Sequence, residues 1–344
     1  MSGFALPLGF SAADLGSNLL EIFHGIVLPV LILAGVGWAL QRRLGLDMST
    51  LARLNFHFTI PCVIYYSVVS AQVSPRDVGM LVLFSLALMA LLAALCLLAA
   101  RVQGLERDRR NALIMTAIFY NSGNYGLPVQ ELAFHAANRH RDAMALQVFV
   151  MIVQNFTSFT LGIWLAASGR KKMEFRKVVR EMLRYPPIYA LLLGLLTVQL
   201  RRMLGPEDAA SAAKLLQPVW KTIEYIYRAF IAVALCTLGA QLGTVRPKLA
   251  RYPVGVSVAL RLLVSPLLGA FLIWLFGLHG FLAQVLLIGS AMPTSVNCLL
   301  LCLEFDNHPD YVARTVLYTT LLSPLTVALT VLFARGGFWD ALAY

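Results

Sequence analysis

The stretch NSGNYGLP, residues 121–128, interrupts an apolar segment that covers residues 111–134. Glycine lowers helix stability by about 1 kcal/mol relative to alanine, and proline removes a backbone donor and clashes with the preceding turn. In a bilayer, the backbone groups freed by such a break must bond to other parts of the protein or face a water-filled cavity. The stretch therefore predicts a broken transmembrane helix with a polar site at its centre.

A second interruption, GSAMPTSVN at residues 289–297, lies inside the apolar segment 281–303. When Asn124 is aligned with Asn297, an acidic residue follows at the same distance in both segments, as Glu131 and Glu304. Each interruption lies in the fourth apolar segment of its half of the chain. Because five segments are an odd number, the second half must cross the membrane in the opposite sense. Inverted repeats with a discontinuous helix in each half are typical of secondary transporters.

The composition agrees with a membrane protein, since 59% of the 344 residues are hydrophobic and 13% are charged. A soluble domain of this size cannot bury so much apolar surface, whereas about 20 apolar residues form one membrane-spanning helix. We expect an all-α membrane protein with ten transmembrane helices, arranged as a 5+5 inverted repeat in which helices 4 and 9 are broken and cross. The expected spans are 19–40, 51–71, 78–100, 111–134, 143–168, 186–200, 218–243, 253–278, 281–303 and 311–334.

The chain divides into a first repeat at residues 1–168, a linker at 169–184 and a second repeat at 185–344. The linker has apolar residues on one helical face and basic residues on the other, which predicts a short helix on the inner membrane surface. Most loop Lys and Arg residues fall on the side of this linker. By the positive-inside rule, both termini then lie outside a plasma (inner) membrane that the chain crosses many times. The net charge of +11 is spread over these loops, so we expect contact with membrane lipids and no nucleic-acid binding.

The two interruptions resemble the paired crossover motifs of the auxin efflux carrier family, which shares a superfamily with the bile acid–sodium symporters. The resemblance extends over nearly the whole chain and includes Arg42-Arg43, Pro61 and the LGAQLG stretch at residues 238–243. It implies a scaffold of helices 1, 2, 6 and 7 and a transport domain of helices 3–5 and 8–10 that moves like an elevator. It also implies a homodimer and a small organic anion as substrate. The short basic linker is more like bacterial members, which are associated with malate or malonate, than like plant members.

The candidate substrate-binding residues lie in and near the two breaks. Asn124 and Asn297 lead, because a carboxamide both donates and accepts hydrogen bonds and can hold a carboxylate or cap a broken helix. Arg261 lies within a span, where an isolated guanidinium is costly, so it needs a partner: a substrate carboxylate, Glu131 or another protein group. The full set is Asn121, Ser122, Asn124, Pro128, Pro293, Thr294, Ser295, Asn297 and Arg261. Gln154 and Asn155 in the fifth span are further polar residues that could line the cavity.

Glu131 and Glu304 are candidates for coupling, because an intramembrane carboxylate can bind and release a proton. The alternatives are an interfacial or a purely structural role. The residues leave coupling to protons, to sodium or to neither open. Sodium is disfavoured because GSAMPTSVN contains no carboxylate to hold a hard cation.

Sequence motifs distinguish between other classes of function. The sequence contains no zinc-protease, P-loop, nucleophile-elbow or dinucleotide motif, and its five cysteines lie in apolar segments. We therefore expect no enzymatic activity, no cofactor and no metal site. The expected function is secondary transport of a small organic anion, auxin-like or a dicarboxylate. The alternatives are a sodium-coupled symporter of the bile-acid type and a membrane protein that senses a ligand without transporting it.

Overall fold

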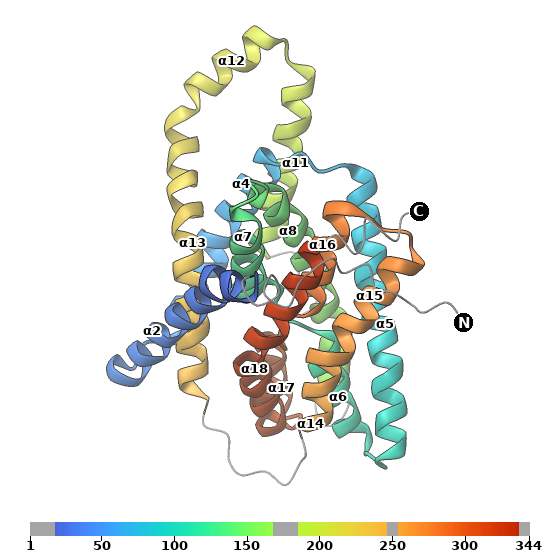
Figure 1. The fold of residues 1–344 in the computed structure, drawn as a ribbon. Helices are drawn as coiled ribbons and strands as arrows, with labels where there is room; N and C mark the ends of the chain where they lie inside the picture. Colours follow the sequence, from blue (N-terminus) through green and yellow to red (C-terminus); the bar gives the residue numbers. More distant parts are fainter. Residues whose placement is uncertain (1–17, 168–184, 246–253, 337–344) are drawn as a thin grey trace, which may run out of the picture.

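The computed structural model describes residues 18–167, 185–245 and 254–336, which are helical almost throughout (Figure 1). Among these residues, 6 helices are long and apolar enough to cross a membrane: Asn18–Leu44, Pro75–Val102, His140–Ala166, Gln217–Thr244, Gly255–Leu275 and Pro309–Arg335. The expectation of an all-helical membrane protein is therefore confirmed. The predicted surface helix at 169–184 lies outside the described residues.

The described part of the first half contains four long continuous helical stretches and one that is interrupted. Several stretches include a π-helical turn (η), which widens the helix by one residue and often accompanies a functional site. The elements are η1 (Phe23–Val27), α2 (Leu28–Leu44), α3 (Met48–Leu54), η2 (Asn55–Thr59), α4 (Ile60–Ser70), α5 (Pro75–Val102), α6 (Arg107–Ile118), η3 (Ser122–Gly126), α7 (Leu127–His135), α8 (His140–Thr157), η4 (Ser158–Gly162) and α9 (Ile163–Ala166).

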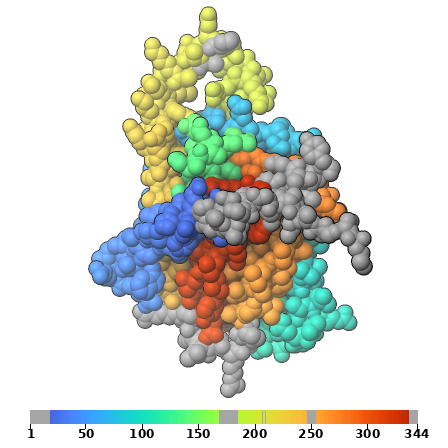
Figure 2. All heavy atoms as spheres, in the orientation of Figure 1, coloured from blue at the N-terminus to red at the C-terminus, as the bar shows by residue number. Residues whose placement is uncertain are grey.

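The second half also contains an interrupted stretch, between α16 and α17. Its elements are α11 (Pro186–Met203), α12 (Pro206–Leu215), α13 (Gln217–Thr244), α14 (Gly255–Ala259), η5 (Leu260–Val264), α15 (Ser265–Leu275), α16 (Gly280–Ser290), α17 (Val296–Phe305) and α18 (Pro309–Arg335). Helix α12 falls between two predicted spans, where we expected only a connection. Its sequence, PEDAASAAKL, is rich in alanine, with acidic residues in the first turn and Lys214 in the last, which all favour a helix. In Figures 1 and 2 it projects at the top of the molecule.

Helix α2 packs closely against the second half of α13 (Figure 1). A methyl group on Gly37 would collide with the carbonyl oxygen of Cys236, and one on Gly239 would collide with the carbonyl oxygen of Ala34. Small residues allow such close approach of two backbones in a membrane. The glycines of the LGAQLG stretch thus have their partner in α2.

The buried apolar residues form two clusters. The larger one joins η1, α5, α6, α8, α16 and α18. The smaller one joins α4, α11 and α13 to one face of α8 and to Leu127 of α7. The fold thus has a group of helices α4, α11 and α13 that meets the rest of the protein across a mainly apolar surface.

The loop between α2 and α3 ends in a capped helix start. The carboxylate of Asp47 accepts hydrogen bonds from the backbone N–H groups of Ser49, at 3.0 Å, and Thr50, at 3.3 Å, and from both hydroxyls. The bonds from the Thr50 hydroxyl and from Ser49 lower the pKa of Asp47 to about 2. The cap therefore stays charged at neutral pH and fixes where α3 begins.

Candidate functional site

The two helix interruptions lie against each other. Tyr120 and Thr294 form an isolated antiparallel bridge. The N–H of Asn121 donates to the carbonyl of Pro293 at 2.8 Å, and the N–H of Ser295 donates to the carbonyl of Phe119 at 3.0 Å. The backbone groups that each broken helix frees are thus bonded by the other break, as an apolar surrounding requires.

A cavity of about 60 Å³ lies beside these breaks. Its wall comes from α3, η2, η3, α8, α13, α17 and the residues between the half-helices. The lining residues are Ala52, Phe56, Ile60, Tyr120, Asn121, Ser122, Gly123, Asn124, Met151, Asn155, Gln241, Ser295, Val296, Asn297 and Leu300. None of these residues is a carboxylate or a formal cation. The wall consists of carboxamides, hydroxyls and apolar groups.

Two half-helices begin at the cavity. Ser122 starts the helical stretch η3–α7 and Val296 starts α17, and both line the wall. The hydroxyl of Ser295 caps α17 by accepting from the N–H of Asn297 at 3.2 Å. A helix N-terminus carries partial positive charge and exposed N–H donors, so both starts favour a negatively charged group between them.

Asn124 and Asn297 are each held by a hydrogen bond to a residue of another helix. Asn55 of η2 donates from its side-chain amide to the carboxamide oxygen of Asn124 at 2.9 Å. Asn297 donates to Asn155 at 3.4 Å, and Asn155 in turn donates to the Tyr185 hydroxyl at 2.7 Å. These bonds leave both carboxamides half-buried at the wall and fix their orientation.

Two glutamines of α8, Gln147 and Gln154, bond the broken segment, and a third, Gln130 of α7, bonds to α16. Gln147 donates to the carbonyl of Ser122 at 2.9 Å, and Gln130 donates to the carbonyl of Val285 at 2.8 Å. The side-chain oxygen of Gln154 accepts from the N–H of Tyr120 at 3.4 Å. The polar residues of α8 therefore hold the irregular backbone in place.

Arg261 lies outside the cavity lining and is fully buried in η5. Its guanidinium donates to the carbonyl of Ala117 at 2.8 Å and also to the carbonyl of Ser290 and the hydroxyl of Ser265. The two carbonyls belong to the last turns of α6 and α16. Its partners in the structure are thus helix ends, and Glu131 is not among the groups to which it bonds.

The remaining predicted residues shape the break. Pro128 is the second residue of α7 and directly follows the π-helical turn η3. The carbonyl of Pro293 accepts from Asn121, and the buried Thr294 donates from its hydroxyl to the carbonyl of Thr116 at 2.8 Å. The structure therefore places Asn121, Ser122, Asn124, Ser295 and Asn297 at the cavity, and Pro128, Pro293, Thr294 and Arg261 behind it.

The two predicted coupling carboxylates have different surroundings. Glu131 is 7% exposed and accepts a hydrogen bond from the Tyr227 hydroxyl of α13 at 2.7 Å. Glu304 is exposed at the end of α17. Only Glu131 therefore combines burial with a bond to another helix group.

Two residues of the site were not marked by the sequence pattern: Gln241, which lines the cavity, and Asn55, which bonds to the cavity residue Asn124. Asn55 is 2% exposed and is a lone carboxamide within the apolar segment 51–71. Its polar side chain among apolar neighbours was the only feature of the sequence that pointed to it. Gln241 lies inside LGAQLG, where its neighbouring glycines draw attention to packing.

These features define a multi-pass α-helical membrane protein with a polar cavity between two helix interruptions. The chain belongs to the family described as membrane transport protein, whose model matches residues 22–331. The resemblance to auxin efflux carriers is thereby confirmed at the level of the family. Among its relatives is an uncharacterized transporter of Methanothermobacter thermautotrophicus, 26% identical over 88% of this chain and 95% of the relative. Another, from Methanocaldococcus jannaschii, is 23% identical over 68% of this chain and 71% of the relative.

Proposed function

We propose that the chain is a secondary carrier that moves a small organic anion across the plasma (inner) membrane, and that it is not an enzyme. The substrate is an auxin-like monocarboxylate or a dicarboxylate such as malate or malonate. The observation that carries the proposal is the cavity at which two half-helices begin beside Asn124 and Asn297. Membership of a membrane transport family supports the carrier function.

The chemistry of the cavity suits a carboxylate. Two helix N-termini supply partial positive charge, and carboxamide and hydroxyl groups supply donors. A fixed acidic residue would repel the anion, and the described lining contains none. Neutral donors also hold an anion less tightly than a formal cation would, which favours its release on the other side of the membrane.

Coupling to sodium is not part of the proposal. Hard cations bind to clusters of oxygen ligands that usually include a carboxylate, and the lining residues provide amide and hydroxyl oxygens alone.

The guanidinium of Arg261 already bonds to the carbonyl ends of α6 and α16. We propose Glu131, rather than the exposed Glu304, as the group that would exchange a proton if transport is proton-coupled. A sodium-coupled symporter is the alternative that a sodium requirement would reveal.

For the architecture we propose a 5+5 inverted repeat, with halves at residues 1–168 and 185–344. The scaffold would comprise η1–α2, α3–α4, α11 and α13, whereas α5–α9 and α14–α18 would form a moving transport domain. The matching places of the two interrupted helices and the separate apolar cluster around α4, α11 and α13 support this division. Both termini would lie outside, and two chains would pair through their scaffolds.

The test is charge movement by the purified protein in liposomes. Malonate, malate and indole-3-acetate are offered in sodium-free buffer, with radiolabel counterflow as a second readout for electroneutral exchange. We expect saturable transport of one of them by the wild type and none by Asn297→Ala, which should remain folded and monodisperse.

The matched control is Asn138→Gly, because Asn138 lies in the turn after α7 with a φ of 53° that glycine adopts readily. It should transport like the wild type. Normal transport by Asn297→Ala would remove the cavity from the mechanism. Saturable binding without current or counterflow would instead indicate a ligand sensor.

A further inference from the structure

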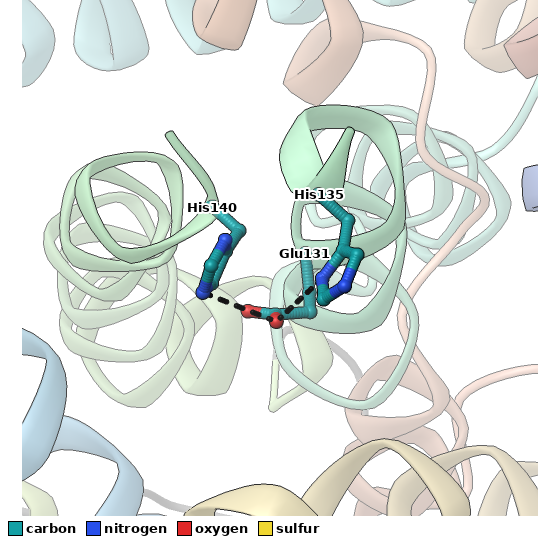
Figure 3. A group of neighbouring side chains, drawn as sticks. All are labelled: Glu131, His135 and His140. Atoms are coloured by element: carbon teal, nitrogen blue, oxygen red, sulfur yellow. Dashed lines mark ion pairs between the residues drawn. The ribbon is translucent and has the colours of Figure 1, made fainter. Parts of the chain in front are cut away.

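Glu131, His135 and His140 form a group of side chains at the end of α7, outside the cavity lining (Figure 3). Glu131 and His135 are one helical turn apart on the same face of α7, because residues four positions apart are neighbours on a helix. His140 begins α8 after a tight turn in which the N–H of Asn138 donates to the carbonyl of His135 at 3.0 Å. The turn brings the third side chain back to the other two, and Figure 3 shows all three pointing toward one another.

The distances within the group are close to those of a metal site. Nδ1 of His135 lies 3.6 Å and Nε2 of His140 lies 3.9 Å from the same oxygen, Oε1 of Glu131. All three ligand atoms lie within 4.8 Å of one another. Tetrahedral Zn²⁺ with bonds of about 2.0–2.1 Å requires its ligand atoms to be roughly 3.3 Å apart. Small side-chain rotations therefore suffice to bring the three atoms into coordination.

The second oxygen of Glu131 is already oriented from outside the group. The Tyr227 hydroxyl donates to Oε2 at 2.7 Å, which leaves Oε1 directed at the two imidazoles. Metal-ligating carboxylates are usually held in this way by an outer hydrogen bond. The nearby guanidinium of Arg139 stacks on the ring of Phe281, 3.7 Å from its centroid, and pairs with Asp142 at 3.8 Å.

The exposure of the three side chains provides both rigidity and access. The Glu131 and His140 side chains are 9% and 16% exposed, whereas that of His135 is 70% exposed. Two ligands are thus preorganised, and the third can close over an ion that arrives from solvent. We propose that Glu131, His135 and His140 bind one Zn²⁺ ion, with a water molecule at the fourth position. Two imidazoles and one carboxylate are a ligand set that Zn²⁺ accepts in proteins.

The site escaped the sequence reasoning because its spacing, Glu-x3-His-x4-His, spans a helix end and a turn. Only the geometry of residues 136–139 shows that His140 returns to α7. The proposal does not depend on the identity of any transported anion, so a binding measurement tests it separately from transport.

The experiment is a Zn²⁺ titration of the full chain in detergent, purified through a tag that contains no histidine and freed of metal with EDTA. Zn²⁺ is titrated in competition with a chromophoric chelator. We expect one Zn²⁺ per chain in the wild type and an affinity at least about tenfold lower in His135→Ala, which loses one ligand. Because His135 is exposed, this variant should fold normally, which its elution profile checks.

The matched control is His279→Ala, which removes an exposed histidine outside the group and should bind Zn²⁺ like the wild type. Tyr227→Phe keeps all three ligands and should weaken binding by about 10-fold, an effect that points to the outer hydrogen bond. Titration with Co²⁺ should give visible absorption bands that His135→Ala lacks. Equal Zn²⁺ affinity in the wild type and His135→Ala, or a wild type that binds less than one ion per chain, would overturn the proposal.

Discussion

Arg261 carries a formal charge into a fully buried position, and the groups to which it donates are neutral. Two of them are the carbonyls of Ala117 and Ser290, in the last turns of α6 and α16, where a helix accumulates partial negative charge. The face of the Tyr120 ring lies 4.8 Å away and adds a favourable electrostatic contact. The guanidinium therefore connects the C-terminal ends of α6 and α16, the first parts of the two interrupted helices, from outside the cavity lining.

We expect Arg261→Met to lower the free energy of unfolding by on the order of 3 kcal/mol, because hydrogen bonds to a charged group are lost and buried carbonyls remain without a donor. Arg261→Lys should lose less, since it keeps the charge but cannot reach both carbonyls with a planar fork. Thermal unfolding in detergent measures both changes. Arg228→Met is the control, because that exposed side chain pairs with Glu224 at its helix surface, and its Tm should match the wild type. An unchanged Tm in Arg261→Met would show that the carbonyls find other donors.

At the scale of single residues, the sequence identified those residues that lie among helix-breaking neighbours. Asn124 and Asn297 could be found because each belongs to a helix-breaking run. Asn55 could not, since one carboxamide in an apolar segment has the same pattern whether it bonds to its own helix or to a distant break. The sequence also indicated that Arg261 needs a partner, but the choice among substrate, Glu131 and protein groups required knowing where α6 and α16 end.

The pairing of α2 with α13 is a property of whole elements, and glycine at two positions makes it possible. Gly239→Ala should lower the free energy of unfolding by about 1–3 kcal/mol, because the new methyl group collides with backbone at Ala34 rather than with a movable side chain. Thermal unfolding and the fraction of monodisperse protein measure this change.

Gly35→Ala is the matched control on α2, because nothing lies within 4 Å of the position its methyl group would occupy. Alanine favours a helix over glycine, so this variant should be as stable as the wild type or slightly more stable. If both alanine variants had the same Tm, close approach at Gly239 would not contribute to stability.

The positions of helices along the chain were easier to predict than which helices pack against each other. The positions of the two interruptions follow from local chemistry, because Gly and Pro act within one or two turns. The glycines of LGAQLG permit close packing, yet nothing local specifies α2 as the partner. Helix α12 was missed because hydropathy alone locates membrane spans, whereas PEDAASAAKL forms a helix through alanine and its end charges.

The whole molecule contains a surface along which one group of helices could move. Helices α4, α11 and α13 meet α7 and α8 through apolar side chains such as Leu127, Met144 and Val148. Few of the hydrogen bonds described above cross this surface: Asn55 to Asn124, Tyr227 to Glu131, and Asn155 to Tyr185, which directly precedes α11. Apolar contacts have no fixed direction, so they tolerate sliding better than a polar network does. The proposed elevator motion is compatible with this arrangement.

If the transport domain moves, the distance between the end of α7 and the start of α13 must change during transport. Spin labels on cysteines at Asn138 and Lys221, both outside the cavity lining, should give a distance distribution that shifts when the transported carboxylate is added. Cys62 and Cys236 are half-buried and would be replaced, whereas Cys96, Cys298 and Cys302 are buried and shielded from the label. Labels at Leu44 and Lys221 provide the control. Because α2 and α13 pack together, the distance between these two labels should not change. A shift in the control pair as large as in the test pair would mean that α2 and α13 do not form one rigid scaffold. A test pair that keeps a single distance while transport proceeds would contradict the elevator and favour local opening around the cavity.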